Sequence, residues 1–178
     1  HYDAKAGKLS LVYKYDAQTH ADIIAQFMEA ANTLLADASP DKTDVENAKS
    51  IYHALCTHMT YDYSALTEFE RKENYYAYLH NSGVCITFAN VYNQLLTQVG
   101  IQTTLAHCDH PETIGHVWSV ITLDGEQYFC DPTYELNYDS GAGYRFFGMN
   151  YADRIANGTG VHGIWGGRYN TYPMDAEM

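Results

Sequence analysis

Cys85, His116 and Asp131 are residues of the types that serve in thiol chemistry, and they lie in the central part of this sequence. A thiolate is a strong nucleophile, an imidazole can take the thiol proton, and a carboxylate can fix the tautomer of that imidazole. Such a set attacks an amide carbonyl and holds the acyl group as a thioester. The chemistry requires the sulfur and the imidazole to be in contact. Whether they are depends on the helices and strands that carry them.

The stretch from Ser82 to Gly100 predicts a buried helix with Cys85 in its first turn. Its apolar residues recur at helical spacing, and Cys85 lies on the same stripe as Phe88. Asn81 or Ser82 can cap the start, and Gly100 can supply the left-handed residue that ends a helix. Free amide groups and the helix dipole at this end favour a thiolate. The alternative is a small apolar residue that only fills the core.

The dipeptide Asp124-Gly125 stands between two alternating segments, a pattern typical of a β-hairpin. With a two-residue turn, Asp131 lies opposite Trp118 and diagonal to His116 on the same face. Diagonal neighbours are about 7–8 Å apart at the backbone, a gap that an imidazole and a carboxylate can bridge. A three-residue turn would move Asp131 to the other face. The hairpin therefore predicts a histidine oriented by an acid.

The remaining elements are predicted from periodicity and breaks, and residues from 137 onward are expected to be mainly loop. In chain order, we expect a strand over 9–15, a helix over 20–37, a helix that a Thr43-Glu46 capping box opens and that buries Cys56, tyrosine-rich helical turns over 65–80, strands over 101–108, 116–123 and 126–133, and a short element around 146–155.

The bulk composition predicts one globular domain over residues 1–178, with 46% hydrophobic and 18% charged residues. The net charge of −12 argues against nucleic acid and anionic membrane surfaces as partners. No apolar run reaches membrane-spanning length and no signal segment is visible, and the start at His1 indicates a piece of a longer protein. We expect free thiols, because the central hairpin strand would separate Cys108 from Cys130.

Several segments resemble the transglutaminase-like superfamily over roughly residues 45–155. Gly83-Val84-Cys85, followed by Phe88-Ala89, is similar to its nucleophile segment. His116-Val117-Trp118 and Asp131-Pro132-Thr133 are similar to its histidine and aspartate segments. The resemblance implies an α+β fold related to papain, in which the nucleophile helix packs against an antiparallel β-sheet. Thr87 departs from the pattern, since a small residue commonly stands there.

The resemblance also implies roles: Cys85 as nucleophile, His116 as base and Asp131 as orienting acid, with a protein or peptide substrate and no cofactor. Contacts to the oxyanion or the substrate are assigned to Trp118, Tyr61 and Tyr63. Similar bacterial domains are often secreted or cell-surface pieces of larger proteins, so an extracellular or cell-surface location is expected. The oligomeric state stays open.

The expected function is cysteine-dependent acyl transfer on amide bonds through a thioester. Water as the acceptor would make the chain a peptidase or amidase, and an amine would make it a transglutaminase. We favour hydrolysis, because a short chain shows no accessory domain that would shield a thioester from water. The alternative is a non-catalytic binding or structural module of a larger cell-surface protein.

A zinc site is the competing interpretation of the same region. His107, Cys108, His110 and His116 offer nitrogen and sulfur ligands, with Asp131 nearby. Strand alternation sends His107 and Cys108 to opposite faces, and the sequence has no paired C-x-x-C motif. We therefore expect no metal site.

Overall fold

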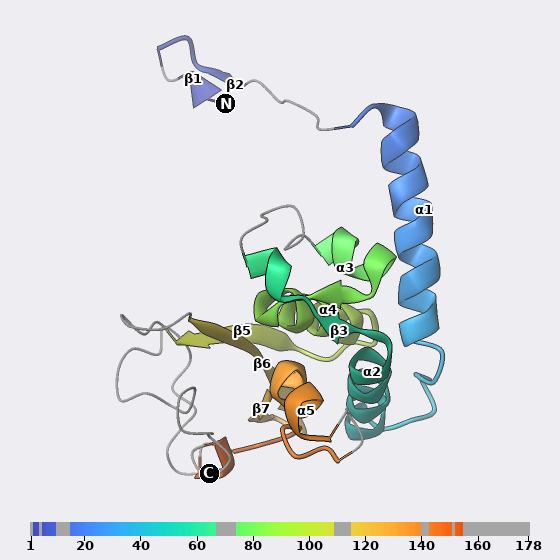
Figure 1. The fold of residues 1–178 in the computed structure, drawn as a ribbon, viewed down its shortest axis with the longest axis vertical. Coiled ribbons are helices and arrows are strands. Elements are labelled where there is room, and N and C mark those ends of the chain that lie inside the picture. The colour runs from blue at the N-terminus through green and yellow to red at the C-terminus, as the bar shows by residue number, and fades with distance from the viewer. Residues whose placement is uncertain are drawn as a thin grey trace.

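The computed structural model describes residues 2–3, 5–9, 15–66, 74–108, 115–139, 143–150 and 152–154, and its fold is α+β (Figure 1). The helices are α1 (Ala17–Leu34), α2 (Asp44–His58), α3 (Asn74–His80), α4 (Cys85–Gln98) and α5 (Pro132–Asp139), with a 3-10 turn, η1, over Tyr63–Leu66. The strands are β1 (Tyr2–Asp3), β2 (Lys8–Leu9), β3 (Thr60–Tyr61), β4 (Ser82–Gly83), β5 (Thr103–Cys108), β6 (His116–Leu123) and β7 (Glu126–Cys130).

The antiparallel sheet β5-β6-β7 has β6 in the centre, as predicted. The hairpin register is also the predicted one, with Leu123 opposite Glu126. Asp124 and Gly125 have φ angles of +54° and +86°, the left-handed pair that a type I′ turn needs. The strand expected over 126–133 ends at Cys130, because the sequence then turns into α5.

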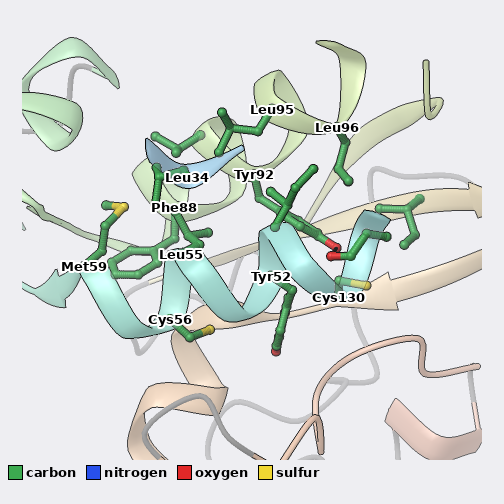
Figure 2. Packing of buried hydrophobic residues seen from close by; sticks show 14 of the residues in the cluster. Leu34, Tyr52, Leu55, Cys56, Met59, Phe88, Tyr92, Leu95, Leu96 and Cys130 are labelled. Atoms are coloured by element: carbon green, nitrogen blue, oxygen red, sulfur yellow. Dashed lines mark hydrogen bonds between the residues drawn. The ribbon is translucent and has the colours of Figure 1, made fainter. Parts of the chain in front are cut away.

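Helix α4 lies between the sheet and α2, and the main core fills this space (Figure 2). Tyr52 of α2 and Tyr92 of α4 are both fully buried, and their rings meet edge to face at 5.6 Å. The Tyr92 hydroxyl also donates to the Ala48 carbonyl at 3.0 Å. Full burial of one large apolar side chain contributes about 1.5–3 kcal/mol, so several such residues hold α4 firmly. Helix α4 is thereby held against α2.

The caps of the first two helices explain where they begin. Asp16 caps α1 by accepting the Thr19 N–H at 2.8 Å, so α1 begins before the predicted residue 20. The predicted capping box of α2 is present, with Thr43 and Glu46 bonded to each other's backbone N–H at 3.2 and 2.8 Å. Cys56 is buried in the core, as expected.

Helix α5 was not predicted. Its signal is the pair Asp131-Pro132, a capping residue followed by a proline in the first helical position. The alternating pattern of the preceding strand was extended to residue 133, so the strand prediction covered this helix start. The short element expected around 146–155 is smaller: Met149 bridges to Phe129, and residues 152–154 form one helical turn.

Other predictions fall partly outside the described residues, including most of the strand over 9–15 and residues 67–73 of the predicted helical turns; residues 109–114, between the strands predicted over 101–108 and 116–123, also lie outside them. Among the helices that the structure describes, none combines the length and apolar character needed to cross a membrane.

Candidate active site

Cys85 is the first residue of α4, with Val84 as the cap. The prediction that Asn81 or Ser82 caps this helix is wrong, because Ser82 and Gly83 form β4 and pair in parallel with β3. Asn81 instead takes a left-handed conformation (φ +49°), and its carbonyl accepts the first bond of that pairing, from Thr60. The expected placement of the Cys85 sulfur in the first turn is confirmed.

Gly83 and Thr87 fit together at this helix start. Thr87 is fully buried, and its Oγ1 accepts the Val84 N–H at 3.4 Å. A Cβ added to Gly83 would lie 2.7 Å from the Thr87 Cβ, closer than such atoms approach. Thr87 is therefore accommodated because residue 83 has no side chain. Its hydroxyl thus accepts a hydrogen bond from the backbone of the residue directly before Cys85.

His116 and Asp131 meet across the hairpin, as the register predicted. The imidazole Nε2 lies 2.7 Å from Asp131 Oδ2, and both side chains are buried. The other oxygen, Oδ1, accepts the Thr133 hydroxyl at 2.8 Å and the Tyr134 N–H at 3.2 Å. The Tyr134 ring stacks on the imidazole at 4.5 Å. The carboxylate thus caps α5 with one oxygen and holds His116 with the other.

The imidazole also interacts with the Cys85 thiol, through a hydrogen bond and through charge. Burial raises the pKa of the thiol, but the hydrogen bond and charge of His116 and the Val117 N–H outweigh it, and the pKa lies below its ordinary value. Burial lowers the pKa of His116, whereas the Asp131 charge and the hydrogen bonds to Asp131 and Cys85 raise it to about 9. Both shifts favour a thiolate–imidazolium pair.

The three residues assigned to oxyanion or substrate contacts lie at different places. The Tyr61 hydroxyl hydrogen-bonds with both the thiol and the backbone N–H of Cys85, and burial raises its pKa. Trp118 is buried, and its ring stacks 5.8 Å from the imidazole of His116. Tyr63 is 71% exposed, with its ring 4.8 Å from that of Tyr61. Tyr61 thus interacts directly with Cys85.

Arg154 is a site residue that the sequence did not indicate. It is fully buried, and its Nη1 lies 2.8 Å from Asp131 Oδ2. Its guanidinium lies over the rings of Trp118 and Tyr134, at 4.6 and 5.0 Å from their centres. The sequence feature that could have indicated this turn is Asn150, which precedes residues 152–154 and caps them by accepting the Asp153 N–H at 2.8 Å.

The zinc alternative depends on side chains at positions 107, 108 and 110, which lie outside the described part of the structure. Within the described part, no three potential metal ligands gather at one place. Cys56, Cys85 and Cys130 are free thiols.

Two comparisons with known proteins bear on this arrangement. Residues 31–132 match the family model of the transglutaminase-like superfamily. A solved structure described as "Crystal structure of a TGase" is similar with a TM-score of 0.50 and 14% identity, over 72% of this chain and 35% of that chain. Identity this low establishes the fold alone, and the chain spans about a third of that structure. No curated protein matches. Because the family match covers more than half of the sequence, the chain belongs to the transglutaminase-like superfamily.

Proposed function

We propose that the chain catalyses acyl transfer on amide bonds, with Cys85 as nucleophile, His116 as general base and acid, and Asp131 as the group that orients His116. One observation carries this proposal. A thiol at the start of a helix contacts an imidazole whose Nε2 lies 2.7 Å from a buried carboxylate. Nδ1 is then the ring nitrogen left to exchange a proton with the sulfur.

In the first half-reaction the Cys85 sulfur attacks the amide carbonyl, and a C–S bond forms while the thiol proton resides on His116. The tetrahedral intermediate collapses by breaking the C–N bond. The leaving nitrogen takes the proton from His116, and a thioester remains on Cys85.

In the second half-reaction, water or a primary amine attacks the thioester and gives its proton to His116. The C–S bond breaks, and the sulfur leaves as a thiolate paired with the imidazolium. The product is a carboxylic acid with water, and a new amide with an amine. The choice of acceptor therefore distinguishes a peptidase or amidase from a transglutaminase.

The negative charge on the intermediate needs donors close to the sulfur. The backbone N–H of Cys85 is at the start of α4, where the helix has unsatisfied amide groups. The Tyr61 hydroxyl is bonded to that N–H. In the proposed complex the substrate carbonyl takes this N–H from Tyr61, and the released hydroxyl donates to the oxyanion. Tyr63 is exposed beside Tyr61 and is assigned to substrate contact.

The second candidate function is a binding module without turnover. The observation in its favour is that Cys85 is only 7% exposed and that Tyr61 bonds with its N–H. A catalyst must open this contact for each substrate, whereas a binding module does not need to.

Thiol labelling separates the two candidates. Iodoacetamide at pH 6 is applied to the native chain, and each cysteine is quantified by mass spectrometry. The acyl transferase predicts that Cys85 reacts about a hundredfold faster than Cys56 or Cys130, because neutral thiols are poor nucleophiles. The Cys85→Ser chain should lose this fast phase and nothing else. Equal labelling of Cys85 and Cys130 contradicts the proposed catalytic role.

The acceptor is identified in a second assay. A glutamine-containing peptide is offered with and without a primary amine, and acid and cross-linked products are measured separately. Cys85→Ser and the native chain are compared under the same conditions. Equal product from the two chains contradicts a reaction through Cys85.

A further inference from the structure

Arg154 shares an oxygen with the proposed base. Its Nη1 lies 2.8 Å from Asp131 Oδ2, and the same oxygen is 2.7 Å from His116 Nε2. Among the described residues, Nε and Nη2 of Arg154 have no hydrogen-bond partner. Within the described structure, Asp131 is thus the polar contact of a fully buried guanidinium.

Aromatic rings hold the guanidinium and the imidazole in one assembly. Trp118 and Tyr134 both lie against Arg154, with 4.6 and 5.0 Å between its guanidinium carbon and their ring centres. The Tyr134 ring is also nearly parallel to the imidazole of His116, at 9° and 4.5 Å. Ring faces attract a desolvated cation and restrict its orientation. The position of Arg154 relative to His116 is therefore fixed by side chains that contact both.

The segment that carries Arg154 is anchored to α5 and the hairpin. The buried carboxylate of Glu135 accepts the Phe146 N–H at 2.7 Å and the Arg145 N–H at 3.1 Å. The Phe146 carbonyl accepts the Asp131 N–H at 2.8 Å. Backbone hydrogen bonds and a buried acid thus connect the segment to the residue that Arg154 contacts.

The charges of the four groups explain what the arginine contributes. A buried thiolate–imidazolium pair beside the Asp131 carboxylate has a net charge of −1. The Arg154 guanidinium brings this cluster to zero, and it stays cationic at every pH where proteins fold. Burying a net charge is costly, so without Arg154 the cluster would retain the thiol proton to a higher pH.

We propose that Arg154 is a positioning residue of the acyl-transfer site, which orients Asp131 and balances the charge of the thiolate–imidazolium pair. The inference rests on the proposed function in that Cys85 must react as a thiolate. Burial raises the pKa of the other titratable groups that face the cluster from β3, α2 and β7 and keeps them neutral: Tyr61, Tyr52, Cys56 and Cys130. From α5, the Tyr134 ring stacks on the imidazole, and the Glu135 carboxylate accepts the Tyr52 hydroxyl and two backbone N–H groups.

The test measures the rate of Cys85 alkylation by iodoacetamide against pH in four variants. Arg154→Met and Arg154→Gln remove the charge but keep a long side chain, and Arg154→Lys keeps the charge. Arg145→Gln removes an exposed arginine from the same segment and serves as the matched control. An arginine next to a carboxylate lowers the pKa of that carboxylate by about 1–3 units. Arg154 reaches the thiol through Asp131, so we expect the shift of the thiol pKa to lie at the lower end of that range. The midpoint should therefore rise by about one pH unit in the two neutral variants, which lowers the rate about tenfold at pH values below the native midpoint.

The lysine variant and the Arg145→Gln control should keep the native midpoint. A neutral variant that reacts more slowly without a change of midpoint shows a merely structural role and overturns the inference. A lysine variant that shifts as far as Arg154→Met also overturns it. If far-UV circular dichroism shows that neither neutral variant folds, Arg154 serves the fold and the inference is again overturned. A native Cys85 that is unreactive at low pH overturns the proposed function itself.

Discussion

Cys85 and Cys130 are buried thiols in two neighbouring regions, the start of α4 and the end of β7, and they have opposite properties. Burial raises the pKa of both. The pKa of Cys130 rises to about 12, although hydrogen bonds from Gly148 and Tyr92 oppose the rise. The pKa of Cys85 falls below its ordinary value because His116 is beside it. Burial alone thus favours the neutral thiol, whereas an adjacent cation favours the thiolate.

Asp131 connects the two regions. Its direct electrostatic effect raises the pKa of both thiols, since a negative charge opposes a second one. For Cys85, however, the same carboxylate raises the pKa of His116 and so maintains the cation that favours the thiolate. Cys130 has no such intermediary among the described residues that shift its pKa. The difference between the thiols is therefore the imidazole placed between carboxylate and sulfur.

Removal of that imidazole should abolish the difference. In His116→Ala, burial and Asp131 both act against the Cys85 thiolate, so its pKa should exceed the ordinary value. The rate of alkylation at pH 6 should fall by about a hundredfold or more, into the range of Cys130. The measurement is labelling of each cysteine by mass spectrometry. His20→Ala, an exposed histidine on α1, is the control and should leave the rates unchanged.

Gly83→Ala should weaken both the fold and the position of Cys85. The new Cβ would lie 2.7 and 2.8 Å from two Thr87 carbons, and overpacking of this kind costs about 1–3 kcal/mol. The free energy of unfolding in urea measures the loss, and Cys85 labelling at pH 6 should slow as the helix start moves.

Gly100→Ala is the matched control for that change. Gly100 has φ +85°, and a Cβ added there meets nothing within 4 Å, so an alanine is strained at this position without touching Cys85. It should lower the stability but leave the labelling rate of Cys85 unchanged. Equal slowing in both variants would mean that stability, and not the position of the helix start, controls the reactivity.

Cys130→Ala should have the smallest effect on reactivity. The substitution removes a buried sulfur that accepts the Gly148 N–H at 3.4 Å, and a stability loss of about 1 kcal/mol is expected. Thermal unfolding measures that loss. The labelling rate of Cys85 should stay within about twofold of the native rate, since Cys130 is not a partner of its sulfur. A large change would show that the two regions are coupled.

Local patterns in the sequence predicted the parts of the site that short segments determine. The Asp124-Gly125 turn determines the register that brings His116 to Asp131, and the apolar stripe determines the face on which Cys85 lies. The same argument missed α5, although its Asp131-Pro132 start is a readable signal.

The other site residues arrive through contacts that leave no period in the sequence. The strand pairing that brings Tyr61 to the level of Gly83 has only two residues on each side, too few to show alternation. Arg154 contacts an acid 23 positions earlier from a single helical turn. Contacts of this kind depend on the assembled fold, so a local pattern such as the Asn150 cap can indicate the turn that carries Arg154 but not the contact with Asp131.

The two oxygens of Asp131 serve different purposes: Oδ1 secures the first turn of α5, and Oδ2 accepts from the imidazole and the guanidinium. An asparagine here can keep its oxygen on the capping side and would then point an amide nitrogen at two hydrogen-bond donors. The N-terminal cap of α5 would then be retained, whereas His116 and Arg154 would lose their common acceptor. Replacement of one oxygen atom by nitrogen at residue 131 is thus the smallest change that would separate the stability of the fold from the proposed acyl transfer.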